Sequence, residues 1–125
     1  MSLYVYITRR RNPFDPGENV DLQDWVAVAS NDSSFRLATV DDYAKLGLNL
    51  VRDDGGTFIW TGHPDGADTW FDWYNGCIDV RNPDAMMIVK MLEIADALNA
   101  TVVSEMGEIF NEDGSHKAFI DGEPW

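Results

Sequence analysis

Residues 68–100, DTWFDWYNGCIDVRNPDAMMIVKMLEIADALNA, decide the fold that this sequence predicts. Asn75-Gly76 separates two strand-like runs, and this pair is typical of a two-residue type I′ hairpin turn, in which both central residues need positive φ. The turn sets Asp72 opposite Asp79, and side chains then alternate between the two faces. A shift of one residue would mix the apolar and polar sets, so the pattern itself supports this register. The inward face carries Phe71, Trp73, Ile78 and Val80, and the outward face carries Trp70, Asp72, Tyr74, Cys77, Asp79 and Arg81.

A helix is predicted directly after the hairpin. Asn82 is expected to cap it, with Pro83 at the first helical position and Asp84 as an acid in the first turn. Apolar residues recur at three- and four-residue spacing and form one stripe, which we expect to pack on the inward face of the hairpin. The stripe consists of Met87, Ile88, Met91, Leu92, Ile94, Ala95 and Leu98.

The flanking sequence predicts further short elements within one domain, residues 1–125. A short helix is expected over residues 21–30, with Trp25 in the core, whereas residues 39–56 fit a helix or a strand equally well. Residues 121–125 look like a tail. Strands are expected over residues 3–9, 57–61, 101–104, 108–110 and 117–120. The prediction is an α+β fold, a mostly antiparallel sheet with two or three helices on one face.

The composition is strongly acidic, with 9 Lys and Arg against 22 Asp and Glu and a formal net charge of −13. Such a balance argues against direct binding to nucleic-acid phosphates and favours a basic protein partner, although acidity also keeps small proteins soluble. One cysteine excludes an internal disulfide framework and fits a reducing compartment. No apolar stretch is long enough to span a membrane. We therefore expect a soluble, cytoplasmic protein.

The outward hairpin face is the candidate site, formed by Trp70, Asp72, Tyr74, Asp79 and Arg81. Directly opposed like charges cost on the order of 0.2–1 kcal/mol in a sheet, so something should compensate the two aspartates. One interpretation is structural, with Arg81 or the arginines of residues 9–11 neutralising the pair. A second is that the pair awaits a basic group of a partner, with Trp70 and Tyr74 as rigid interface anchors.

Two further hypotheses assign other roles to these acids. The opposed carboxylates of Asp72 and Asp79 would suit acid/base chemistry in a small enzyme, provided that they lie in a cleft. Acids spread at phosphate-like spacing would instead make the protein a mimic of nucleic-acid charge. No catalytic, metal or cofactor motif accompanies either hypothesis. We expect His63, in a His-Pro turn, to be solvated rather than a metal ligand.

Several segments together resemble a family of small acidic bacterial proteins without an assigned activity. They are YVYITR (4–9), DLQDW (21–25), WTGHP (60–64), WF (70–71), GCIDV (76–80), NPD (82–84) and GEIF (107–110). The likeness covers most of the chain, fits least well over residues 40–51, and carries no catalytic motif. In size and charge the chain also resembles immunity proteins, which neutralise toxins of the same or neighbouring cells. The resemblance implies an inhibitor that masks a cationic surface.

Overall fold

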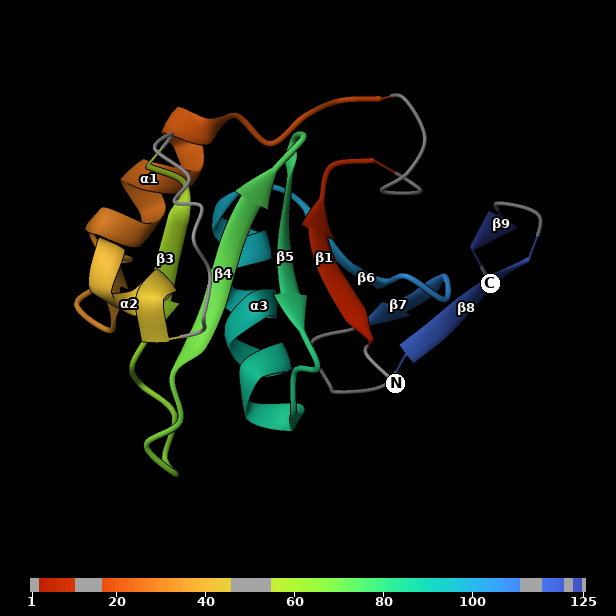
Figure 1. Cartoon of the computed structure of the whole chain (residues 1–125). Coiled ribbons are helices and arrows are strands. Elements are labelled where there is room, and N and C mark those ends of the chain that lie inside the picture. Colours follow the sequence, from red (N-terminus) through yellow and green to blue (C-terminus); the bar gives the residue numbers. More distant parts are fainter. Residues whose placement is uncertain (1–2, 11–16, 46–54, 111–115, 121–122, 125) are drawn as a thin grey trace.

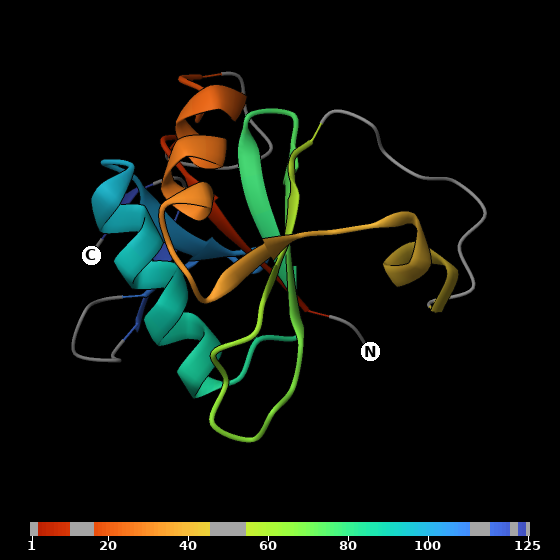
Figure 2. The same cartoon turned by 90° about the vertical axis from the view of Figure 1, so that its left-hand side faces the viewer.

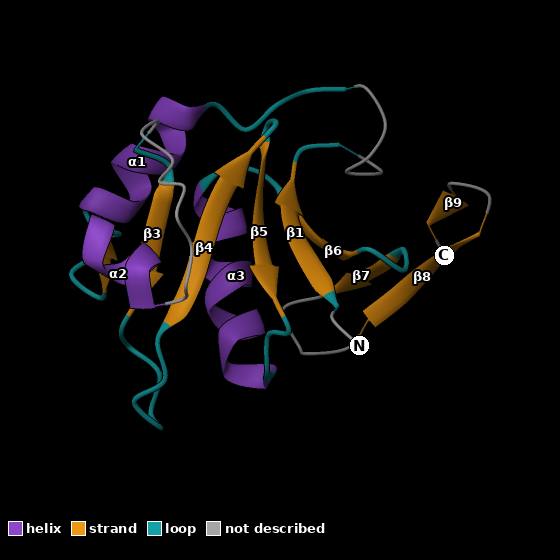
Figure 3. Cartoon of the chain, viewed as in Figure 1, coloured by secondary structure: helices purple, strands orange, loops and turns teal. Residues whose placement is uncertain are grey.

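The computed structural model describes residues 3–10, 17–45, 55–110, 116–120 and 123–124. Its strands form one antiparallel arrangement in the order β2-β3-β4-β5-β1-β6-β7-β8-β9 (Figures 1 and 3). The strands are β1 (Tyr4–Thr8), β2 (Phe35–Leu37), β3 (Thr57–Trp60), β4 (Thr69–Tyr74), β5 (Cys77–Arg81), β6 (Thr101–Ser104), β7 (Glu108–Phe110), β8 (His116–Ile120) and β9 (Glu123–Pro124). The N-terminal strand β1 therefore lies in the middle, between β5 and β6.

Helices lie on both faces of this sheet. The two longer ones, α1 (Leu22–Ser30) and α3 (Ala85–Ala97), cover the same face, whereas the short α2 (Val40–Lys45) lies on the opposite face (Figure 2). We call the face opposite α1 and α3 the outer face. The predicted α+β class with a mostly antiparallel sheet is confirmed, and two helices share a face as expected.

The hairpin of β4 and β5 has the predicted register. Asp72 pairs with Asp79, Trp73 with Ile78 and Tyr74 with Cys77. Asn75 and Gly76 both have positive φ, 52° and 81°, as a type I′ turn requires. The inward residues Phe71, Ile78 and Val80 are fully buried, and Trp73 is half-buried.

Trp25 of α1 joins the inner face of the sheet to the helix layer. Its ring meets Phe35 and Phe58 edge-on, at centroid distances of 5.6 and 5.5 Å, and stacks near Phe71 at 6.1 Å. Its indole nitrogen donates a buried hydrogen bond of 2.9 Å to the carbonyl oxygen of Gly56. A buried tryptophan usually satisfies its N–H in this way, and its large apolar area contributes strongly to the core.

The start of α3 differs from the prediction. Asp84, and not Asn82, is the N-cap, and its carboxylate accepts a 3.0 Å hydrogen bond from the Met87 backbone N–H. Asn82 adopts a left-handed φ of 50°, and its side chain accepts a 2.7 Å bond from the backbone N–H of Leu3. Asn and Asp both cap helices well, and the contact with the N-terminal strand decides which residue does so here.

Two other expectations need qualification. Of the ambiguous residues 39–56, Val40–Lys45 form α2, and residues 46–54 lie outside the described residues. Part of the predicted tail is a strand, because Glu123 pairs with Ile120 and Pro124 with Phe119. Among the described helices, none combines the length and apolar character that membrane crossing requires.

Two glycines with positive φ generate the first prediction. Gly66→Ala should destabilise the protein by about 1–2 kcal/mol, because Gly66 has a φ of +78° and no atom within 4 Å of the place where a Cβ would lie, so only backbone strain counts. Gly76→Ala, in the hairpin turn, should cost about 1 kcal/mol more. There the new Cβ would lie 2.6 Å from Nη2 of Arg10 and would also meet the side chain of Asn19. Both side chains would have to move and lose hydrogen bonds that hold the turn.

Urea unfolding of both variants measures this difference. Equal losses for Gly76→Ala and Gly66→Ala would show that the contacts of Arg10 and Asn19 do not stabilise the turn.

Candidate functional site

The outer face brings polar and aromatic side chains of four neighbouring strands into one row. Thr57 of β3 pairs with Asp72 of β4, Asp72 with Asp79 of β5, and Asp79 with Tyr6 of β1. Such cross-strand neighbours have Cβ atoms about 4.5–5.5 Å apart. The two aspartates therefore lie side by side, between a hydroxyl on one side and a phenol on the other.

A hollow of about 330 Å³ lies at one end of this face, where β4 and β1 begin and β5 ends. Four of the five predicted site residues line it, namely Trp70, Asp72, Asp79 and Arg81. The fifth, Tyr74, is 64% exposed and does not line the hollow. The remaining lining residues are Tyr4, Asp68, Thr69 and Met87.

Each of the two aromatic rings that line the hollow packs against another aromatic side chain. Trp70 meets Tyr43 of α2 edge-on, with centroids 5.2 Å apart, and Tyr4 stacks near Tyr6 at 6.4 Å. Such pairs add roughly 0.5–1.5 kcal/mol beyond the area that they bury. Neighbouring side chains therefore hold both rings in place.

A chain of hydroxyl groups orients Asp72. The Tyr43 hydroxyl donates to Oγ1 of Thr57 over 2.9 Å, and the Thr57 hydroxyl donates to Oδ1 of Asp72 over 2.7 Å. Thr57 has a single hydroxyl proton, so its bond to Asp72 leaves it as the acceptor from Tyr43. The helix α2 thus fixes both Trp70 and Asp72.

Tyr6 shows the effect of the surrounding acids. Burial, together with the charges of Asp79 and Glu105, raises the pKa of Tyr6 from 10.0 to about 12. Both causes disfavour the anionic phenolate. The Tyr6 phenol, which its ordinary pKa of 10.0 already keeps neutral near pH 7, therefore stays protonated to higher pH beside Asp79.

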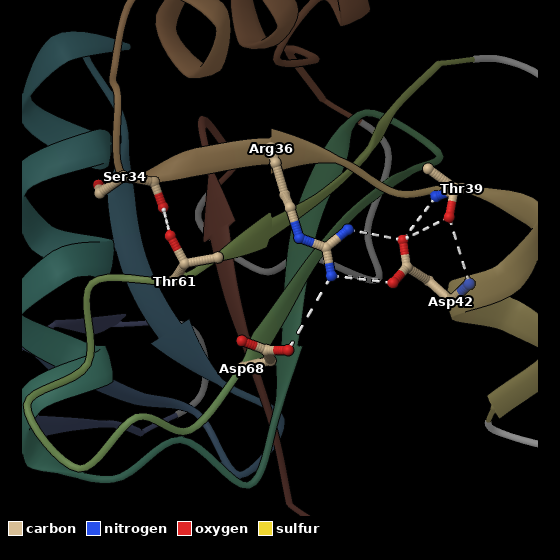
Figure 4. A network of polar contacts seen from close by, with 6 residues as sticks. All are labelled: Ser34, Arg36, Thr39, Asp42, Thr61 and Asp68. Carbon is tan, nitrogen blue, oxygen red and sulfur yellow. Dashed lines mark hydrogen bonds and ion pairs between the residues drawn. The ribbon is translucent and has the colours of Figure 1, made fainter.

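The helix α2 is anchored by a buried carboxylate (Figure 4). Asp42 receives two hydrogen bonds from the Arg36 guanidinium, at 2.7 and 2.9 Å, and another from the Thr39 backbone N–H at 2.7 Å. These interactions lower the pKa of Asp42 well below its ordinary value of 3.8. Nη2 of Arg36 also lies 4.0 Å from Asp68, so it links the anchor to the rim of the hollow.

Of the arginines of residues 9–11, Arg9 and Arg10 make contacts away from the two aspartates, and Arg11 lies outside the described residues. Arg9 donates to the carbonyl oxygen of Leu98 at 2.9 Å and forms a 3.4 Å ion pair with Asp24. Arg10 donates to the Asn75 carbonyl oxygen at 2.6 Å, which is at the hairpin turn. Arg81 lines the hollow with both aspartates, so neutralisation of the pair by Arg81 stays a prediction.

His63 is not the solvated turn residue that its sequence suggested, because its side chain is almost fully buried. Nδ1 accepts the Asp65 backbone N–H at 3.0 Å, so Nε2 carries the proton and donates it to Asp84 at 2.7 Å. The ring also lies 5.9 Å from Trp60. His63 therefore ties the loop before β4 to the N-cap of α3.

Cys77 is a buried free thiol. It is 5% exposed, and its thiol lies 3.4 Å from Oγ1 of Thr8. Within the described residues, no three His, Cys, Asp or Glu side chains are grouped to hold a metal ion. That the protein needs no metal or cofactor stays a prediction.

Sequence reasoning missed Tyr4, Asp68, Thr69 and Met87 as lining residues. The alternation of residues 3–9 does predict an aromatic and polar face that includes Tyr4. Nothing local in the sequence shows that this strand pairs with β5, because its partner is over seventy residues away. These residues could have been predicted only from the order of the strands in the sheet.

Comparisons with protein-family models, with curated proteins and with solved structures give no match for this chain. The resemblance to small acidic bacterial proteins and to immunity proteins therefore stays a prediction. Roles for residues of the hollow follow from their geometry and chemistry alone.

The anchor of α2 generates the second prediction. Asp42→Asn should lower the free energy of unfolding at pH 7, because the folded protein stabilises the ionised carboxylate. That contribution is complete above the unfolded pKa near 3.8 and is lost as pH falls through the depressed folded pKa. The difference between wild type and Asp42→Asn should therefore shrink steadily below about pH 4.

Urea unfolding curves between pH 7 and pH 2 measure this difference. The exposed Asp41 of the same helix provides the control variant Asp41→Asn, which should differ little from wild type. A difference for Asp42→Asn that does not change with pH would mean that the charge of Asp42 does not anchor the helix.

Proposed function

We propose that this protein binds a basic protein partner through its outer face, as an immunity-type inhibitor that masks a cationic surface. One observation carries the proposal. Two carboxylates on paired strands, Asp72 and Asp79, line a hollow whose other walls include Trp70 and Tyr4. Trp and Tyr are enriched among the residues that dominate binding energy in protein interfaces, and complementary charges fix the orientation of a partner.

The charge of the whole chain supports this function. A formal net charge of −13 creates a negative field that attracts basic proteins over a distance. Such steering raises association rates and is screened by salt, with a Debye length of about 10 Å at 0.1 M. The proposed complex should therefore form quickly at low salt and weaken as salt is added.

The rigidity of the site supports it as well. Ordering loops and side chains during association makes binding weaker, because conformational entropy is lost. A site that is already ordered avoids this cost. Here Tyr43 contacts Trp70, Thr57 donates to Asp72, and Tyr6 stacks near Tyr4. The exposed Tyr74 extends the aromatic surface beyond the hollow toward the hairpin turn.

A small enzyme remains a second candidate, because Asp72 and Asp79 line one hollow and acid/base pairs need such proximity. The two functions predict different behaviour of a double variant. A loss of turnover without loss of a protein partner would favour the enzyme.

The third prediction tests the binding function by affinity capture from lysate of the source cells at low and moderate salt. Wild-type protein should retain a basic protein, identified by mass spectrometry, and release it as salt rises. Asp72→Asn/Asp79→Asn should lose at least tenfold in affinity for the purified partner, about 1.4 kcal/mol or more. Asparagine keeps an oxygen that can accept the Thr57 hydroxyl, so the variant should fold.

The control is Asp21→Asn/Asp96→Asn, which removes the same two charges from exposed positions on or beside α1 and α3. It should reduce the association rate modestly and leave the dissociation rate unchanged. An equal loss of affinity in both double variants would show that only net charge matters, and would refute a site on the outer face. Retention of no basic protein by wild type would argue against the function itself.

A further inference from the structure

We infer that a second hollow, which lies between α3 and the end of β3, binds a small uncharged molecule that joins a carbonyl oxygen to an apolar chain. We call it the α3 hollow. Its volume of about 400 Å³ falls within the range for ligand pockets, roughly 300–1,000 Å³. The inference goes beyond the proposed function, because α3 lies on the opposite face of the sheet from Asp72 and Asp79 (Figure 2).

The indole N–H of Trp60 is the first sign of a ligand. Trp60 lines the α3 hollow and is only 6% exposed, yet within the described residues its Nε1 makes no hydrogen bond. A buried tryptophan usually finds a partner for this group, so the exception needs an explanation. Nε1 is not one of the unpartnered atoms that are closed off from the surface. An acceptor that enters the α3 hollow can therefore reach it.

Gly62 leaves the space beside this N–H open. A Cβ at Gly62 would lie 2.7 and 3.1 Å from Nε1 and Cε2 of Trp60, and 3.3 Å from Cβ of Ser34. All three residues line the α3 hollow. Thr61 fixes this rim, because its backbone N–H and its hydroxyl donate to the Ser34 carbonyl oxygen at 2.8 and 3.0 Å (Figure 4). The donor thus faces a space of defined shape that a carbonyl oxygen can enter.

Apolar side chains of α3 form another wall. Met86 and Val89 line the α3 hollow and are 46% and 57% exposed. A ligand chain that covers them removes apolar area of both molecules from water, which favours binding. The N–H donor and the apolar wall together fit a molecule in which a carbonyl group is attached to an aliphatic chain.

The charged residues of the lining neutralise each other, which favours an uncharged ligand. Among the described residues they are Lys90 and Glu93. Nζ of Lys90 lies 2.5 Å from Oε2 of Glu93, 2.5 Å from Oδ2 of Asp32 and 5.5 Å from the ring centroid of Phe35. An anion would compete with both carboxylates for Lys90 and would meet the net charge of −13. A cation would compete with Lys90 for the same carboxylates.

Titration of ¹⁵N-labelled full-length protein with hexanamide tests this inference by NMR. Hexanamide carries one carbonyl oxygen and an aliphatic chain and has no charge. We expect a saturable downfield shift of the Trp60 indole N–H resonance, because a new hydrogen bond deshields this proton, and Trp60→Phe assigns the resonance by removing it. Hexanoate, which has the same chain with a charge, and acetamide, which lacks the chain, should each bind at least tenfold more weakly.

Two glycine variants of one loop locate the binding. Gly62→Ala should weaken hexanamide binding at least tenfold, because its methyl group would fill the space beside Nε1 of Trp60. Gly66→Ala also strains this loop, but nothing lies within 4 Å of its added Cβ, so it should keep binding within about twofold. A native-like spectrum of each unliganded variant checks its fold.

A second pair of variants avoids any movement of Trp60. Val89→Ser, at an exposed position of α3, should weaken hexanamide binding by about threefold or more, because it removes part of the apolar wall. Val40→Ser, at an exposed position of α2, should leave the binding unchanged.

Several outcomes would overturn the inference. The absence of a saturable Trp60 shift with hexanamide would refute a small-molecule site, even if a protein partner moved the same resonance. Equal binding of hexanoate or acetamide would refute the ligand class, and unchanged binding in Gly62→Ala and Val89→Ser would place the molecule elsewhere. Asp72→Asn/Asp79→Asn should not change hexanamide binding, so this inference and the proposed function can fail separately.

Discussion

The register of the central hairpin is the constraint on which the rest of the structure depends. A slip of one residue would turn Phe71 and Ile78 outward and bury Asp72 and Asp79 against the helices. The turn prevents this slip because Asn75 and Gly76 both hold positive φ, which few residue pairs adopt. Val20 reinforces the turn, since its N–H donates to the Gly76 carbonyl oxygen at 2.8 Å. The core and the candidate site therefore share one local cause.

The outer face has a small apolar cluster of its own, separate from the main core. Ile59 is 1% exposed although its side chain is on the same face as Trp70, and Tyr43 of α2 is also buried. This cluster depends on α2, a helix of six residues that is too short to be stable alone. Its stability comes from the Arg36 and Asp42 ion pair and from the packing of Tyr43. The hollow is thus coupled to a polar anchor at the edge strand β2.

The two aspartates of the candidate site lie side by side at a cost in stability. Like charges on paired strands are unfavourable, and the net charge of −13 increases that repulsion. The Thr57 hydroxyl reduces this cost by donating a hydrogen bond to Asp72. This bond holds the Asp72 carboxylate in one orientation, which would favour the proposed binding of a basic partner.

The sequence by itself determined the elements whose signals are local. Asn75-Gly76 specifies the turn through backbone φ, alternation specifies which face Phe71 and Asp72 take, and apolar periodicity specifies the stripe of α3. It also indicated four residues of the hollow, because those four share one face of the hairpin.

Tertiary structure decided the features that depend on contacts between distant segments of the chain. Asp84 rather than Asn82 caps α3 because Asn82 binds Leu3, just before the N-terminal strand. His63 is buried where its loop meets Trp60 and the N-cap residue Asp84. The hollow itself exists because β1 pairs with β5 and α2 lies on the outer face, and contacts between distant segments leave no periodic signal in a single sequence.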